Sequence, residues 1–140
     1  MDPISVTASI IAVIQLSSKL LSVCFKYSQC VVGARTDIER LKDSIESLNI
    51  ALIEVNQLLN GPDGERLKSS HKLAKYLLDC SLLLDSLDRK TEAGKHQKLM
   101  RRIGMRALKW PFDAKEIDKI IKDLADGRET IHLALQADVV

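Results

Sequence analysis

The chain has 140 residues and a formal net charge of +2, with 46% hydrophobic and 29% charged residues. This length and composition are typical of one globular domain with a single core, and they exclude an intrinsically disordered chain. The near-neutral total hides an uneven distribution. From Lys90 to Lys109 there are seven Lys and Arg against one acid, Glu92, so this segment is basic and the remainder is net acidic.

The first stretch, residues 2–33, is predicted to be a helix. Asp2 is a favourable N-cap, Pro3 suits the first helical position, and Gly33 is a helix-terminating glycine. No charged side chain occurs from Pro3 to Ser18, and apolar residues fall on more than one face. Such a helix is covered either by other helices or by lipid, and the sequence leaves both alternatives open.

If this helix enters a membrane, the apolar residues of its first four turns are the candidate inserting side chains. Small residues between them allow close helix–helix approach in lipid as well as in a protein core. The candidates are Ile4, Val6, Ile10, Ile11, Val13, Ile14 and Leu16.

No secretory signal peptide is expected, because Asp2 stands where a basic region is required. The longest unbroken apolar run, Ile10–Ile14, is shorter than the roughly 20 residues of a constitutive transmembrane helix. We therefore expect a cytoplasmic protein. An odd number of cysteines without CxxC spacing predicts buried free thiols at Cys24, Cys30 and Cys80.

The second predicted helix begins with a capping box formed by Thr36 and Glu39 and ends at the turn sequence Asn60–Gly64. Its apolar residues recur at alternating spacings of three and four, which is typical of a helix in an antiparallel bundle. These residues are Ile38, Leu41, Ile45, Leu48, Leu52, Val55 and Leu59.

The third predicted helix extends from about Glu65 to about Thr91. Its main apolar stripe is widened by Leu78, Leu82 and Leu83, so we expect it to contact two neighbouring helices. The main stripe consists of Leu73, Leu77, Cys80, Leu84 and Leu87.

The last predicted helix begins at Asp113, which forms a capping box with Glu116. Gly127 lies inside it and is expected either to bend the helix or to let a neighbour come close, at a cost of about 1 kcal/mol relative to Ala. The stripe of this helix is Ile117, Ile120, Ile121, Leu124, Ile131 and Leu135.

Between the third and last helices, the segment 95–109 is predicted to be a short basic amphipathic helix. Trp110, Pro111 and Phe112 end it and form a structural junction, because a proline disfavours helical angles at the preceding residue. The basic face suits an anionic membrane, although a merely solvated face remains an alternative. That face consists of Lys95, Lys98, Arg102, Arg106 and Lys109, and beside it lie Leu99, Ile103, Ala107 and Trp110.

The predicted fold class is therefore all-α: an antiparallel bundle of four long helices plus a short basic helix, forming a single domain over residues 1–140. We expect no enzyme, no cofactor and no metal site. The chain has no GxSxG, P-loop or GxGxxG motif, and its histidines lack partners at metal-ligand spacing. Nucleic-acid binding is not expected, since few aromatic residues accompany the basic segment.

Five short stretches carry a recognisable combination of residues: Met1–Ser5, Ser9–Leu16, Leu108–Phe112, Lys115–Ile117 and Leu133–Asp138. Together they resemble the fungal HeLo-like N-terminal domain over essentially the whole chain. The resemblance implies an all-α bundle at the N-terminus of fungal NOD-like (STAND) receptors, ahead of a nucleotide-binding oligomerisation domain. Relatives of this type execute programmed cell death in heterokaryon incompatibility by oligomerising and permeabilising the plasma membrane through the N-terminal segment. Membrane-active relatives carry a glycine zipper there, whereas no Gly precedes Gly33 in this chain.

The first hypothesis is a cell-death effector or signalling domain that is cytoplasmic at rest and moves to the plasma membrane when clustered. Its expected partners are further copies of itself, anionic lipids and a downstream nucleotide-binding receptor domain in cis or in trans. The alternative is a protein–protein interaction module that relays a receptor signal without inserting. On that alternative, a charge placed at Ile11 is expected to unfold the bundle.

Overall fold

The computed structural model describes residues 3–31, 33–62, 64–68, 70–91 and 110–137. All regular secondary structure in these ranges is helical, which confirms the all-α class. The helices are α1 (Pro3–Cys30), α2 (Arg35–Leu59), α3 (Gly64–Lys68), α4 (His71–Thr91) and α6 (Ala114–Ala137).

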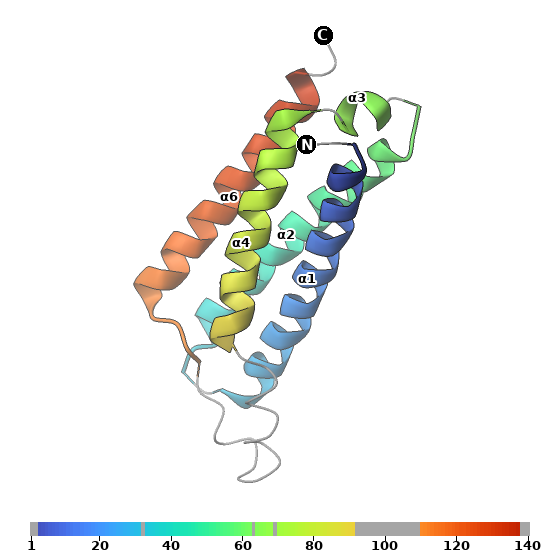
Figure 1. Ribbon diagram of the computed structural model, residues 1–140. Coiled ribbons are helices and arrows are strands. Elements are labelled where there is room, and N and C mark those ends of the chain that lie inside the picture. Colours follow the sequence, from blue (N-terminus) through green and yellow to red (C-terminus); the bar gives the residue numbers. More distant parts are fainter. Residues whose placement is uncertain (1–2, 32, 63, 69, 92–109, 138–140) are drawn as a thin grey trace.

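The four long helices lie lengthwise beside one another (Figure 1). α1 packs against α2 and α4, and α6 packs against the same two helices. The short α3 lies near one end and contacts α1 and α2 (Figure 1). Between α1 and α2 the chain turns at Gly33, whose φ of +100° lies in the left-handed region that favours glycine.

The core is built from the apolar stripes that the sequence predicts. All seven stripe residues of α2 are at most 2% exposed, and the five main stripe residues of α4 are also buried. α6 contributes Ile117, Leu124 and Ile131 to the same core, while Ile120, Ile121 and Leu135 are half-buried against it. Burial of these side chains is the main stabilising contribution to the fold.

One of the two predicted capping boxes is confirmed, and the other is wrong. At the start of α6, the Asp113 carboxylate accepts a hydrogen bond from the Glu116 N–H at 2.8 Å, and the Glu116 carboxylate accepts one from the Asp113 N–H at 3.4 Å. α2 instead begins one residue before Thr36, with Ala34 at the N-cap position and no side-chain cap. Thr36 is therefore inside the first turn, where its hydroxyl cannot serve as the cap.

The third predicted helix is divided in two. Ser70 precedes α4, and its hydroxyl accepts a hydrogen bond from the Leu73 N–H at 3.3 Å, so a serine cap starts a new helix. The wider stripe is only partly buried: Leu78 is 53% exposed and Leu82 is 63% exposed, whereas Leu83 packs against the core. α4 has two main neighbours, α1 and α6, yet neither helix covers the side chains of Leu78 and Leu82.

Gly127 of α6 lets a neighbouring helix come close, as one of the two sequence-based alternatives proposed. A Cβ atom at this position would lie 2.5 Å from the hydroxyl oxygen of Tyr76 on α4 and 2.6 Å from a ring carbon. Tyr76 is 8% exposed. The absent side chain of Gly127 therefore provides the space that the Tyr76 ring occupies.

Candidate functional site

α1 has one buried face and one exposed face. The buried face packs on α2 and α4 and includes Val6, Ile10, Val13 and Leu20, none more than 2% exposed. On the opposite side Ile11 is 44% exposed and Phe25 is 53% exposed. α1 is thus not a central helix wrapped on all sides. It lies at the edge of the bundle and presents part of its apolar surface to solvent.

The candidate inserting residues are divided between these two faces. Val6, Ile10 and Val13 are part of the core, Ile14 and Leu16 are half-buried against it, and Ile11 is exposed. The side chain of Ile4 lies outside the described residues. The 44% exposure of Ile11 argues against the expectation that a charge at this position unfolds the bundle. We expect a charged side chain at Ile11 to stay in water and to leave the core intact.

By length and composition, one helix of the described chain is able to cross a membrane. It comprises Val6–Gln29, has a mean hydropathy of 1.8, and is 33% buried in its most apolar window. The sequence-based criterion of an unbroken apolar run missed it, because the runs are interrupted by Ser and Gln and only rarely by charge. The core helix of a soluble protein meets the same criteria, so the exposed outer face is the more informative feature.

Polar side chains join α1 to α2 halfway along their contact. The Asn49 amide of α2 donates hydrogen bonds to the hydroxyl oxygens of Ser17 at 2.7 Å and Ser18 at 3.2 Å. Ser17 is fully buried, and its own hydroxyl donates to the carbonyl oxygen of Ile14 at 2.9 Å. Separating α1 from α2 therefore exposes a hydrogen-bonded polar cluster as well as apolar side chains.

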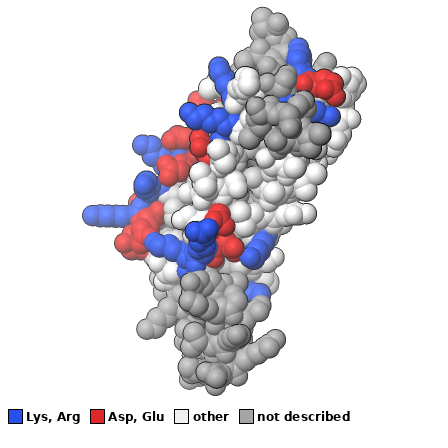
Figure 2. Space-filling view, in the orientation of Figure 1, with Lys and Arg blue, Asp and Glu red and all other residues white. Residues whose placement is uncertain are grey.

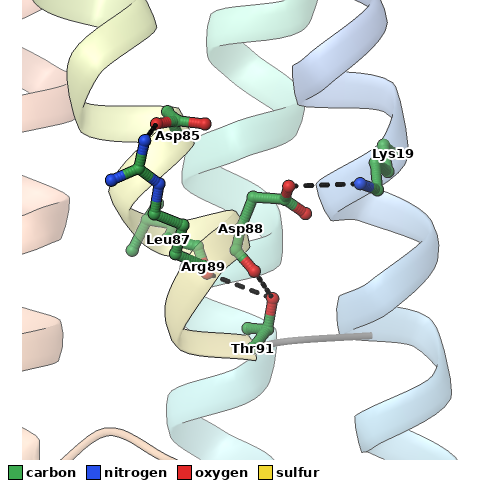
Figure 3. Close-up of polar contacts among 6 residues, drawn as sticks. All are labelled: Lys19, Asp85, Leu87, Asp88, Arg89 and Thr91. Carbon is green, nitrogen blue, oxygen red and sulfur yellow. Dashed lines mark hydrogen bonds and ion pairs between the residues drawn. The ribbon is translucent and has the colours of Figure 1, made fainter. Parts of the chain in front are cut away.

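Figure 3 shows a second polar connection, between α1 and the last turn of α4. The Lys19 ammonium lies 3.1 Å from the Asp88 carboxylate. Close to it, the Thr91 hydroxyl donates to the carbonyl oxygens of Leu87 at 3.1 Å and Asp88 at 3.0 Å, which fixes the buried threonine at the helix end. Because Lys19 is largely solvent-exposed, this ion pair orients α1 more than it stabilises the fold.

The predicted structural junction is ordered around Tyr27 of α1. The Tyr27 hydroxyl donates to the carbonyl oxygen of Thr91 at 3.2 Å, and its ring meets Trp110 edge-on at 5.1 Å. Trp110 meets Phe112 in the same way at 5.1 Å, and Phe112 is buried. Thr91 and Trp110 are the residues on either side of the undescribed stretch 92–109. The two residues that flank that stretch therefore contact the same side chain of α1.

The predicted anionic-lipid face lies wholly outside the described residues, but its attachment point is known. Along α1 from Val6 to Tyr27 the helix rises by roughly 30 Å at 1.5 Å per residue. The first turns of α1 and the junction at Tyr27 therefore lie at opposite ends of α1. The residues of that predicted lipid face are Lys95, Lys98, Arg102, Arg106 and Lys109.

The described cysteines have no features of a reactive site. Cys24 and Cys80 are buried and free, as the sequence predicts. Burial raises the pKa of Cys24 to about 12 and that of Cys80 to about 11, so both are neutral thiols near neutral pH. Among the residues that the structure describes, no group of three or more His, Cys, Asp and Glu is placed to hold a metal ion.

Comparisons with protein-family models, with curated proteins and with solved structures give no match to the chain. The resemblance to HeLo-like domains therefore depends on the sequence stretches given above, and the function that it implies is a proposal.

Proposed function

We propose that this chain is the HeLo-like effector or signalling domain of a fungal immune-type receptor, and that it controls programmed cell death. In this proposal the domain is an antiparallel bundle of four long helices plus a short basic helix, and it is cytoplasmic at rest. Clustering by a downstream nucleotide-binding domain, in cis or in trans, brings copies together. The clustered domains then associate with anionic lipids of the plasma membrane through α1 and the basic segment.

The observation that carries the proposal is the outer face of α1. From Pro3 to Cys30 the sequence contains no Asp or Glu, and its two lysines, Lys19 and Lys26, are both exposed. In Figure 2 the described surface on the α1 side is largely without charge, while charged residues gather over the side of α4 and α6. An exposed helix face that combines apolar and cationic groups suits an anionic membrane interface. The exposed residues of this face are Ala8, Ile11, Ala12, Gln15, Ser18, Lys19, Ser22, Phe25, Lys26 and Gln29.

This geometry suggests two stages. First, α1 lies along the membrane by its outer face, assisted by the basic segment 95–109, and each cationic side chain near the surface contributes about 1 kcal/mol. Deeper insertion requires α1 to leave α2 and α4. That step exposes Val6, Ile10 and Val13, and burial of each of these side chains contributes about 1.5–3 kcal/mol to the stability of the bundle. Clustering on lipid is the condition under which such a cost is offset.

The decisive experiment compares vesicle flotation and dye leakage for two matched pairs of substitutions. Ile11→Glu with Phe25→Glu places charges on the outer face of α1. Ile50→Glu with Ile53→Glu places them on α2, where the two side chains are 52% and 40% exposed. Both variants are expected to fold, as checked by circular dichroism. Only the α1 variant should lose binding to anionic vesicles, and equal behaviour of the two variants would overturn the proposal.

Deletion of residues 2–14 is a less suitable test of membrane association than these substitutions. It removes three core side chains, Val6, Ile10 and Val13, and so unfolds the bundle as well as removing the candidate membrane segment. Replacing Lys98, Arg102 and Arg106 by Ala tests the basic face separately. This variant should keep its fold and lose flotation with anionic vesicles.

The alternative function is a protein–protein interaction module that never inserts. The observation in its favour is the exposed apolar surface of α4. Leu78 and Leu82 are each more than half exposed, so no other helix of the described chain covers them. On this alternative the wild-type protein self-associates but does not float with vesicles at any protein-to-lipid ratio. The same flotation experiment therefore separates the two functions.

A further inference from the structure

A groove of about 320 Å³ lies between α4 and α6. It is on the side of α4 away from its contact with α1, since α4 packs between α1 and α6. Tyr76 and Gly127 line the groove where the two helices approach closely, and Cys80, Leu83 and Leu124 line it as well. The groove is therefore apolar inside.

The charged residues that line the groove are all acidic: Asp79 of α4 and Asp123 and Asp126 of α6. None of the three forms an ion pair with another residue of the described ranges. Other acids of the same two helices do form such pairs, for example Asp88 with Lys19 and Asp118 with Arg40 at 2.7 Å. Within the described ranges, the three groove carboxylates thus form a local negative rim in which none has an ion-pair partner.

Exposed apolar surface continues from the groove over α4. Leu82 is three residues from Asp79, so the two side chains are neighbours on the helix surface. Leu82 is 63% exposed and Leu78, one turn before it, is 53% exposed. An apolar groove with an acidic rim and an apolar shoulder is complementary to a helix that has an apolar face beside a basic face.

The chain itself contains a segment of that chemistry. In residues 95–109, Leu99, Ile103 and Ala107 recur at helical spacing beside five Lys and Arg of the basic face. We propose that the α4–α6 groove binds the basic segment 95–109 of a second copy of this chain. The apolar residues of the segment occupy the groove, and its cationic side chains pair with Asp79, Asp123 and Asp126.

The segment of the same chain is a poor occupant because the described residues on either side of it, Thr91 and Trp110, are both held at Tyr27. As a helix, residues 95–109 are about 22 Å long. Lys95 is four residues after Thr91 and so stays within about 14 Å of it even in a fully extended chain. If such a helix lay lengthwise along the groove of its own chain, one of its ends would be too far from Tyr27. The chain could then not join it both to Thr91 and to Trp110. A second copy is free of this restriction.

A contact of this kind joins two different surfaces, a segment on one copy and a groove on the next. Such heterologous contacts repeat in one direction and build rings or open chains, which gives clustered domains a defined arrangement. We expect this contact to be weak until a receptor raises the local concentration of the domain. The inference rests on the self-association in the proposed function, and it does not depend on the membrane step.

The test uses sedimentation velocity of the full 140-residue chain over a wide range of concentration at low salt. The groove variant is Asp79→Asn, Asp123→Asn and Asp126→Asn. The control variant, Asp43→Asn, Glu46→Gln and Glu54→Gln, makes the same change in net charge on exposed residues of α2. Loss of three partly exposed ion pairs should weaken self-association about tenfold in the groove variant only. Added salt should weaken the wild-type association as well.

A charge exchange shows whether the contact is between copies. One variant carries Lys in place of Asp79, Asp123 and Asp126, and the other carries Glu in place of Lys98, Arg102 and Arg106. Each is expected to be monomeric alone, and their mixture should associate because opposite charges meet again. A wild-type chain that stays monomeric at every concentration, or a mixture that does not associate, would overturn the inference. Vesicle flotation of the groove variant is expected to be retained, so failure of this contact and failure of the membrane proposal give different results.

Discussion

The hydroxyl of Tyr27 donates a hydrogen bond to the carbonyl oxygen of Thr91 at 3.2 Å, although 64 residues separate the two in sequence. The ring of the same tyrosine packs edge-on against Trp110. A single side chain of α1 therefore holds the end of α4 and the approach to α6. This arrangement brings Thr91 and Trp110, the two residues that flank the undescribed stretch 92–109, to the same side chain.

Replacing Tyr27 by Phe tests the polar half of this contact. The substitution removes the hydrogen bond to Thr91 and retains the ring that packs on Trp110, so the free energy of unfolding should fall by about 1 kcal/mol. Replacing Tyr27 by Leu should cost roughly 1 kcal/mol more, because the edge-on aromatic pair is also lost. Denaturant titrations of the two variants and the wild type measure both steps. Equal stabilities for Tyr27→Phe and the wild type would show that the hydrogen bond makes no net contribution.

Gly127→Ala tests the close approach of α4 to α6. In an unhindered helix this change stabilises by about 1 kcal/mol. Here the new methyl group would lie 2.5 Å from the Tyr76 hydroxyl oxygen, so we expect a net loss of roughly 1–2 kcal/mol instead. Introducing Tyr76→Leu together with Gly127→Ala should recover part of that loss through a coupling of about 1 kcal/mol. Thermal unfolding of the two single variants and the double variant completes the cycle, and strict additivity would argue against the contact.

Ile10 and Ile11 are adjacent in sequence and differ completely in environment. Ile10 is 0% exposed and Ile11 is 44% exposed. Ile10→Glu places an unpaired charge in the core and should destabilise by roughly 4 kcal/mol, whereas Ile11→Glu should change stability by about 0.5 kcal/mol or less. Urea unfolding compares the two. A large loss in Ile11→Glu would mean that the outer face of α1 is covered by part of the bundle.

These two isoleucines also show what the sequence could and could not predict. Apolar periodicity located the helices and nearly all of the core, because each stripe has a spacing that only one face of a helix provides. Around α1 the apolar residues extend over more than one face, so periodicity could not decide between Ile10 and Ile11. The buried face was decided by contacts with α2 and α4, which are tertiary. By contrast, the α3–α4 break had a local signal in Ser70, a good N-cap residue that the longer periodic pattern obscured.

The buried thiols predict a loss of stability at high pH. An ordinary cysteine has a pKa of 9.0, and burial raises that of Cys24 to about 12 and that of Cys80 to about 11. At a pH between 9.0 and the raised pKa of each thiol, the unfolded chain loses the thiol proton and the folded chain keeps it. The free energy of unfolding should therefore fall as the pH rises above about 9. The stabilising effect is complete below that pH. Denaturant titrations below and above pH 9 measure how steeply the free energy of unfolding depends on pH. A variant with Cys24 and Cys80 replaced by Ala should show a weaker dependence.

The polar cluster between α1 and α2 provides a test of whether α1 leaves the bundle at a membrane. Asn49→Ala removes the hydrogen bonds to Ser17 and Ser18, while Ser17 keeps its bond to the Ile14 carbonyl oxygen. We therefore expect a loss of about 1–2 kcal/mol in the free energy of unfolding. Because the lost bonds join α1 to α2, the free energy of separating the two helices should fall by the same amount.

If dye leakage requires that separation, Asn49→Ala should increase leakage from anionic vesicles about tenfold at limiting protein, since 1.4 kcal/mol corresponds to a factor of ten in an equilibrium constant. Asn56→Ala is the matched control. It changes the same residue type on the same helix, and the side-chain oxygen of Asn56 is buried with no hydrogen-bond partner among the residues described. Greater leakage in the Asn49 variant alone supports release of α1. Unchanged leakage in a destabilised Asn49 variant would contradict release and favour membrane contact through the outer face, with the bundle intact.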